Sequence, residues 1–133
     1  MLYVWDTTAR TPPNCLMIKT ILLYVMAALY VVAGINHFVR PRMYVKIIPP
    51  YLPAPEMLNY VAGAAEVMLG VGLLFSATRP WAAWGIVALL VAVFPANLYM
   101  YQHNTFGIPS WVLLVRLPLQ LVLIAWAWWY TGG

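Results

Sequence analysis

The chain has 133 residues, of which 65% are apolar and only 8% are charged, and its mean hydropathy of +0.83 lies outside the range of ordinary soluble domains. Seven Lys and Arg against three Asp and Glu give a formal charge of +4, but these charges stand near the ends of apolar stretches, which argues against nucleic-acid binding and favours anchoring at a membrane surface. The single cysteine, Cys15, excludes an internal disulfide, a CxxC redox pair and a metal site built from cysteines.

Residues 1–16 have no helical apolar period and contain Pro12 and Pro13, so we predict a poorly ordered N-terminal tail, with Met17 as a candidate start of the protein.

A bilayer core of about 30 Å needs roughly 20 apolar residues of helix. Four stretches meet this requirement, namely 17–37, 57–77, 81–101 and 111–130. We therefore predict an all-α fold, an integral membrane four-helix bundle that forms one transmembrane domain over residues 17–131.

The segment 38–56, between the first two stretches, combines five prolines with several large apolar side chains. Prolines prevent a long helix, and the apolar content disfavours a loop in water. We predict a Pro-rich interfacial first loop that lies in the head-group layer and covers the bundle.

With four spans, both termini and the turn at 76–80 lie on one face, where tryptophans and a tyrosine form an aromatic belt. Lys and Arg are equally frequent on the two faces, so the positive-inside rule gives no orientation.

Small residues recur every four positions in two of the predicted spans, which is the pattern of close helix packing in lipid. The residues are Ala62 and Gly70 on either side of Glu66, and Ala88, Ala92 and Ala96. We predict that both faces are buried against neighbouring helices, with Gly34 in the same role in the first span. Pro95 and Pro118 each remove a backbone hydrogen bond in mid-span, so we expect the third and fourth helices to bend or loosen there.

The polar residues of the spans gather in one layer, within roughly one to two helical turns of the interface under the first loop. They are Asn36, His37, Glu66, Asn97, Arg116 and Gln120. A lone charge at membrane depth costs about 2.5 to 3.5 kcal/mol, so we expect Glu66 and Arg116 to point inward and form a pair. Two interpretations follow. The layer is either a set of structural hydrogen bonds between helices, or it lines a pocket for a polar head group such as a quinone ring or a lipid phosphate.

His37 admits three roles, which are a structural or interfacial one, proton transfer or contact with a head group, and ligation of a metal or haem. The second histidine, His103, falls in the predicted third loop, and two histidines without a Cys or Asp partner are a weak metal signal. The sequence contains no Gly-rich phosphate loop, nucleotide motif or Ser-His-Asp order. We therefore predict no catalytic residue, no metal and no covalently bound cofactor.

Several separated motifs, in order, resemble the DoxX family of small bacterial membrane proteins over residues 17–130. The motifs are GINHF followed by RP, PPYLPAPE followed by AAEVMLGVGLL, WGIVALLVAVFPANLYMY and RLPLQLVLIAWAWWY. The resemblance implies a four-helix bundle in a bacterial cytoplasmic membrane. It also implies a link to redox chemistry, because one branch of that family forms the membrane subunit of a thiosulfate:quinone oxidoreductase. No catalytic residue carries over, and the spans contain no cysteine for thiol chemistry.

Three functions are consistent with these features. The first is an accessory subunit of a membrane redox system that binds a quinone or lipid head group in the polar layer and has no enzyme activity as an isolated chain. The second is a structural or assembly subunit of a larger membrane complex, in contact with other membrane proteins or with further copies of this chain. The third is transport of a small solute, which four short helices favour least because they enclose little space.

Overall fold

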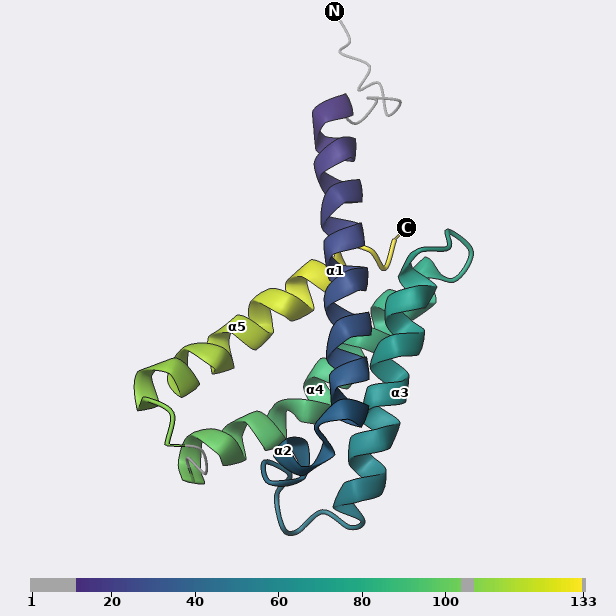
Figure 1. Ribbon diagram of the computed structural model, residues 1–133. Helices are drawn as coiled ribbons and strands as arrows, with labels where there is room; N and C mark the ends of the chain where they lie inside the picture. Colours follow the sequence, from purple (N-terminus) through teal and green to yellow (C-terminus); the bar gives the residue numbers. More distant parts are fainter. Residues whose placement is uncertain (1–11, 104–106, 133) are drawn as a thin grey trace, which may run out of the picture.

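The computed structural model describes residues 12–103 and 107–132, and every regular element in this part of the chain is a helix (Figure 1). The elements are α1 (Pro13–Val39), α2 (Pro41–Val45), α3 (Pro55–Leu73), α4 (Arg79–His103) and α5 (Ser110–Trp128). The all-α prediction is confirmed. Most of the predicted tail, residues 1–11, lies outside the described residues.

Prolines begin three of these helices. Pro13, Pro41 and Pro55 stand in the first turns of α1, α2 and α3, where a missing N–H costs nothing and the fixed φ suits a helix. The prediction that the tail extends to residue 16 is therefore wrong, because α1 already starts at Pro13. The prediction that prolines prevent a long helix in the first loop is confirmed, since α2 has only 5 residues.

Three helices, α1, α4 and α5, are long and apolar enough to cross a membrane. The remaining long helix, α3, has 19 residues and includes Glu56, Asn59 and Glu66. It ends at Leu73, four residues before the predicted end of that span, and a turn leads to α4. Helices α4 and α5 continue through Pro95 and Pro118 without interruption.

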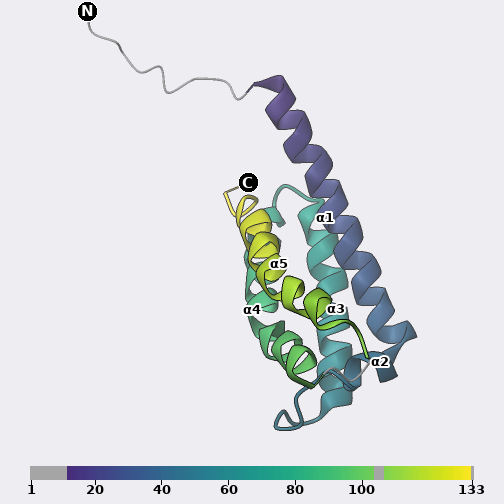
Figure 2. The ribbon, with the colours of Figure 1, turned by 90° about the vertical axis from the view of Figure 1, so that its left-hand side faces the viewer.

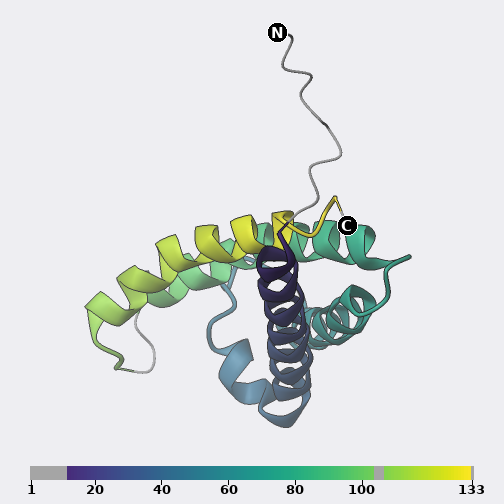
Figure 3. The same cartoon turned by 90° about the horizontal axis from the view of Figure 1, so that it is seen from above.

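The long helices pack in chain order, α1 on α3, α3 on α4 and α4 on α5, whereas the described backbones of α1 and α5 make no close approach. Figure 1 shows α5 diverging from α1, and Figure 3 shows α4 and α5 running alongside each other. The start of α1 and the end of the chain lie at the same end as the turn between α3 and α4, and α2 lies at the opposite end (Figures 1 and 2). For the start of α1, the end of α5 and the turn between α3 and α4, this agrees with the predicted arrangement, whereas the N-terminal residues 1–11 lie outside the described part.

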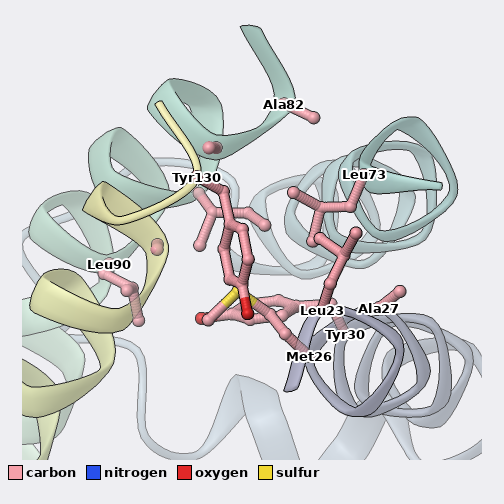
Figure 4. Close-up of a cluster of buried hydrophobic side chains, with 11 residues drawn as sticks. Leu23, Met26, Ala27, Tyr30, Leu73, Ala82, Leu90 and Tyr130 are labelled. Carbon is pink, nitrogen blue, oxygen red and sulfur yellow. The ribbon is translucent and has the colours of Figure 1, made fainter. Parts of the chain in front are cut away.

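The buried apolar core gathers around Tyr130 of the C-terminal turn, whose ring points towards Leu23 and Met26 (Figure 4). Its members come from α1, α3, α4, the end of α5 and the C-terminal turn, and they are Leu23, Met26, Ala27, Tyr30, Leu73, Ala82, Ala83, Ile86, Leu90, Ala127 and Tyr130. The Tyr130 hydroxyl donates to the Lys19 carbonyl oxygen at 2.9 Å. The Lys19 ammonium in turn lies 5.5 Å from the centre of the Trp129 ring, a cation–π distance. The C-terminus is thereby fixed to α1.

Glycines bring α1 and α3 into direct backbone contact, as the sequence predicts. A Cβ added to Gly34 would lie 2.6 Å from the Gly63 carbonyl oxygen, and one added to Gly70 would lie 3.0 Å from the Ala27 carbonyl oxygen. The same prediction is wrong for α4, where Ala88 is exposed. The reason is the rotation of α4 about its own axis. The helix turns another face towards the core, namely the one with Ala82, Ala83, Ile86 and Leu90. The row of Ala88, Ala92 and Ala96 therefore does not face the core, and Ala92 and Ala96 line a cavity instead.

We predict that Gly34→Ala destabilises the protein by about 1–3 kcal/mol, because the new methyl group overlaps backbone atoms that cannot move independently. Thermal unfolding in a mild detergent should show a lower midpoint for this variant. Gly132→Ala is the control, since no atom lies within 4 Å of the position a Cβ would take there. Equal midpoints for the two variants would contradict the tight α1–α3 contact.

Candidate functional site

A cavity of about 410 Å³ lies at the α2 end, among the last turn of α1, the first loop, α3, α4 and one residue of α5. We call it the polar pocket. Its polar lining consists of His37, Tyr44, Asn59, Glu66, Asn97 and Arg116, and the other lining residues are aliphatic. The first loop contributes Ile47, Ile48 and Leu52 to the wall, and Pro49 of the same loop is fully buried. The prediction that this loop covers the polar layer is confirmed.

His37 is the centre of the polar contacts in this pocket. Its Nδ1 lies 2.7 Å from Asn59 Oδ1, and the Asn59 amide Nδ2 donates to the His37 carbonyl oxygen at 3.0 Å. On the other side of the ring, Nε2 lies 3.3 Å from Glu66 Oε2, and the side chains of His37 and Glu66 are only 11% and 14% exposed. The Tyr44 ring stacks on the imidazole with 3.8 Å between the ring centres. All of these partners hold the imidazole in one orientation.

The contacts of Asn59 determine where the imidazole carries a proton. A carbonyl oxygen can only accept, so the Asn59 atom that faces the His37 carbonyl is the amide nitrogen. The amide oxygen then faces Nδ1, which must donate in that hydrogen bond. Nε2 and the Glu66 carboxyl oxygen remain face to face. They lie 3.3 Å apart, an ion-pair distance when the imidazole is protonated, and Glu66 Oε2 has no hydrogen-bond partner among the described residues.

The predicted pairing of Glu66 with Arg116 is wrong. Both side chains line the polar pocket, but within the described residues Glu66 pairs with His37. The Arg116 Nη1 donates instead to the Met100 sulfur, at 3.2 Å. The reason lies in the packing order, because α3 packs directly on α1 and α4, whereas α5 packs only on α4.

The remaining predicted site residues divide between the pocket wall and its supports. Asn97 lines the pocket and donates from Nδ2 to Gln120 Oε1 at 2.9 Å. Gln120 is buried and does not line the pocket, and its Nε2 donates to the Leu90 carbonyl oxygen. Asn36 also stands outside the lining, where its Nδ2 donates to the Tyr44 hydroxyl at 2.7 Å. Asn36 and Gln120 therefore position their neighbours rather than face a ligand.

The site residues predicted from the sequence do not include three residues of this region, namely Asn59, Tyr44 and Tyr30. Asn59 lies close to the start of α3, where a polar side chain is expected to face the membrane–water interface. In the structure it is instead buried, with 1% of its surface exposed. Its spacing of seven from Glu66, which puts both residues on one helix face, is the signal that could have revealed it. Tyr44 and Tyr30 resemble ordinary interfacial or core aromatics in sequence. The Tyr30 hydroxyl is buried without a described hydrogen-bond partner and lies within electrostatic range of Glu66.

A model of the family described as a domain of unknown function, DUF8561, matches residues 26–131. The chain belongs to this DUF8561 family. The match begins within α1 and includes every residue of the polar pocket, so the site lies wholly inside the DUF8561 domain. Neither the curated proteins nor the solved structures contain a match to this chain.

The polar pocket of this DUF8561 domain presents hydrogen-bonding groups rather than a cluster of metal ligands among the described residues. Both ring nitrogens of His37 are already engaged, so the imidazole has no free lone pair for a metal ion while these contacts persist. No cluster of three or more His, Cys, Asp and Glu side chains occurs within residues 12–103 and 107–132. The pocket instead offers the His37–Glu66 pair, a guanidinium and the amides of Asn59 and Asn97 beside an aliphatic wall.

We predict that Asn59 fixes the proton of the imidazole on Nδ1. Nitrogen NMR of histidine-labelled protein should show a protonated Nδ1 at neutral pH in a His103→Gln background, where His37 is the one histidine left. Adding Asn59→Leu removes the acceptor, and the neutral ring should revert towards its usual Nε2–H tautomer. A neutral ring with a bare Nδ1 in the background protein would contradict the assignment.

Proposed function

We propose that this DUF8561 protein is a four-helix integral membrane protein that binds the head group of a quinone or lipid in the polar pocket. In this proposal α3 is the fourth span. The protein acts in a bacterial cytoplasmic membrane as an accessory subunit of a redox system. The resemblance of its motifs to the DoxX family supports the redox assignment.

The outer surfaces of the helices support a membrane location for all four. Large apolar side chains are exposed on each of them, including Val32 on α1, Met68 on α3 and Leu121 on α5, which are 67%, 73% and 67% exposed. At 1.5 Å per residue, the 19 residues of α3 extend about 28 Å, close to the thickness of a bilayer core. Asn59 and Glu66 of α3 face the pocket, so a lipid-embedded α3 would keep their polarity away from the acyl chains.

The observation that carries the binding proposal is the combination of the His37–Glu66 pair with an aliphatic cavity. A cavity of about 410 Å³ falls within the size range of small-molecule sites. Its hydrogen-bonding groups gather around His37 and on α4 and α5, whereas Ile47, Ile48 and Leu52 provide an apolar wall. This division matches an amphiphile with a small polar head and a hydrocarbon tail.

A structural subunit of a larger membrane complex is the second candidate, and one observation favours it. Because the described backbones of α1 and α5 do not approach each other, the row of helices is not closed by contacts within one chain. A partner protein or another copy of the chain could supply contacts there. Purification in a mild detergent would then return a complex of defined composition rather than this chain alone.

We predict that organic extraction of the purified protein, followed by mass spectrometry, yields a quinone or a lipid in near-stoichiometric amount. Glu66→Gln should lower that amount about tenfold, or about 1.4 kcal/mol of binding free energy, because it removes the carboxyl group that faces His37 Nε2 in the pocket. Glu56→Gln is the matched control, since Glu56 is exposed, lies on the same helix and does not line the polar pocket. Extracts without any retained amphiphile would refute the binding proposal.

A further inference from the structure

The charge of the polar pocket follows from its ionisable lining residues, which are His37, Tyr44, Glu66 and Arg116. A single proton on the His37–Glu66 pair, whose facing atoms lie 3.3 Å apart, would give that pair zero net charge. Arg116, which is always protonated, would then leave the pocket with a net charge of about +1.

Arg116 has no anionic partner within the part of the chain that the structure describes. Its contact is the thioether of Met100, which is a weak acceptor. The residue is exposed and lines the pocket, so its guanidinium can be reached by a ligand. A cation without a counter-ion at membrane depth is costly, and an anion that binds there recovers part of that cost.

We propose that the ligand of the polar pocket is an amphiphile whose head group carries one negative charge, a carboxylate or a phosphodiester, bound by Arg116. This inference rests on the binding function proposed above and narrows it, because it selects an anionic lipid or acid over a neutral quinone. The planar guanidinium can bind both oxygens of such a head group at once. The tail then lies against the aliphatic wall formed by Ile47, Ile48 and Leu52.

The test measures the affinity of the purified full chain, in a non-ionic detergent, for four probes by calorimetry. The probes are oleate, a short-chain phosphatidylglycerol, the matching phosphatidylcholine and decylubiquinone. We expect oleate or phosphatidylglycerol to bind at least about tenfold more tightly than the two probes without net charge. Tight binding of phosphatidylglycerol alone identifies a membrane lipid as the source of the anion, and tight binding of oleate alone identifies a free acid.

Variants of Arg116 test the residue itself. Arg116→Gln should abolish the preference for anions, and Arg116→Lys should retain most of it. Arg42→Gln is the matched control, because Arg42 is exposed at the same end of the molecule and does not line the polar pocket. Should Arg116→Gln fail to fold, the salt dependence of the original protein takes its place: anion affinity should fall as ionic strength rises, whereas quinone affinity should not.

Two results would overturn the inference. Decylubiquinone binding as tightly as the anions, with no effect of Arg116→Gln, would remove the anion selectivity while leaving the binding function intact. Tighter anion binding in Glu66→Gln would show that the Glu66 charge opposes the anion, so that the pair with His37 is not neutral. Failure of all four probes, together with extracts free of any amphiphile, would refute the binding function itself.

Discussion

The absence of a side chain at Gly63 is the constraint on which the site depends. A Cβ there would lie 2.7 Å from the His37 Cβ, so only glycine lets the end of α1 rest directly on α3. Asn59, Gly63 and Glu66 share one face of α3 at spacings of four and three. His37 therefore sits over the glycine, with the amide on one side of its ring and the carboxylate on the other. Close backbone packing and ring orientation are thus two results of the same contact.

Much of the fold was accessible from the sequence, because long apolar stretches and prolines specify helices and their ends locally. Depth was accessible as well, since it follows from counting residues along a helix, and the polar residues do gather under the first loop. Which side chains pair with each other could not be predicted from the sequence. Glu66 and Arg116 stand at similar depths, but which helix lies beside which is decided by tertiary packing, and α3 packs on α1 and α4 rather than on α5. Rotation about the helix axis was equally hidden for α4, where the alanine row does not face the core.

The two ends of the molecule differ in how they are held together. At one end, Tyr130 and Lys19 close an apolar cluster in which aliphatic and aromatic side chains interlock. At the other end, hydrogen bonds and the His37–Glu66 pair connect α1 to α3, and the Asn97–Gln120 bond connects α4 to α5, around a space that these side chains do not fill. A folded apolar end can maintain the positions of polar groups whose own contacts change when a ligand enters. The apolar core and the polar pocket thus occupy separate parts of one small domain.

The packing of the helices in chain order has a consequence for biogenesis. Each long helix contacts the long helix made just before it, so its packing surface is already present in the part of the chain synthesised earlier. The contacts are local along the sequence, and little entropy is lost in searching for distant partners. The contacts of α1 with the C-terminal turn are exceptions, among them the hydrogen bond from Tyr130 to the Lys19 carbonyl oxygen, which spans 111 residues, and the Lys19–Trp129 cation–π contact. They can form only after α5 is complete, so they are among the last contacts made as the chain is synthesised.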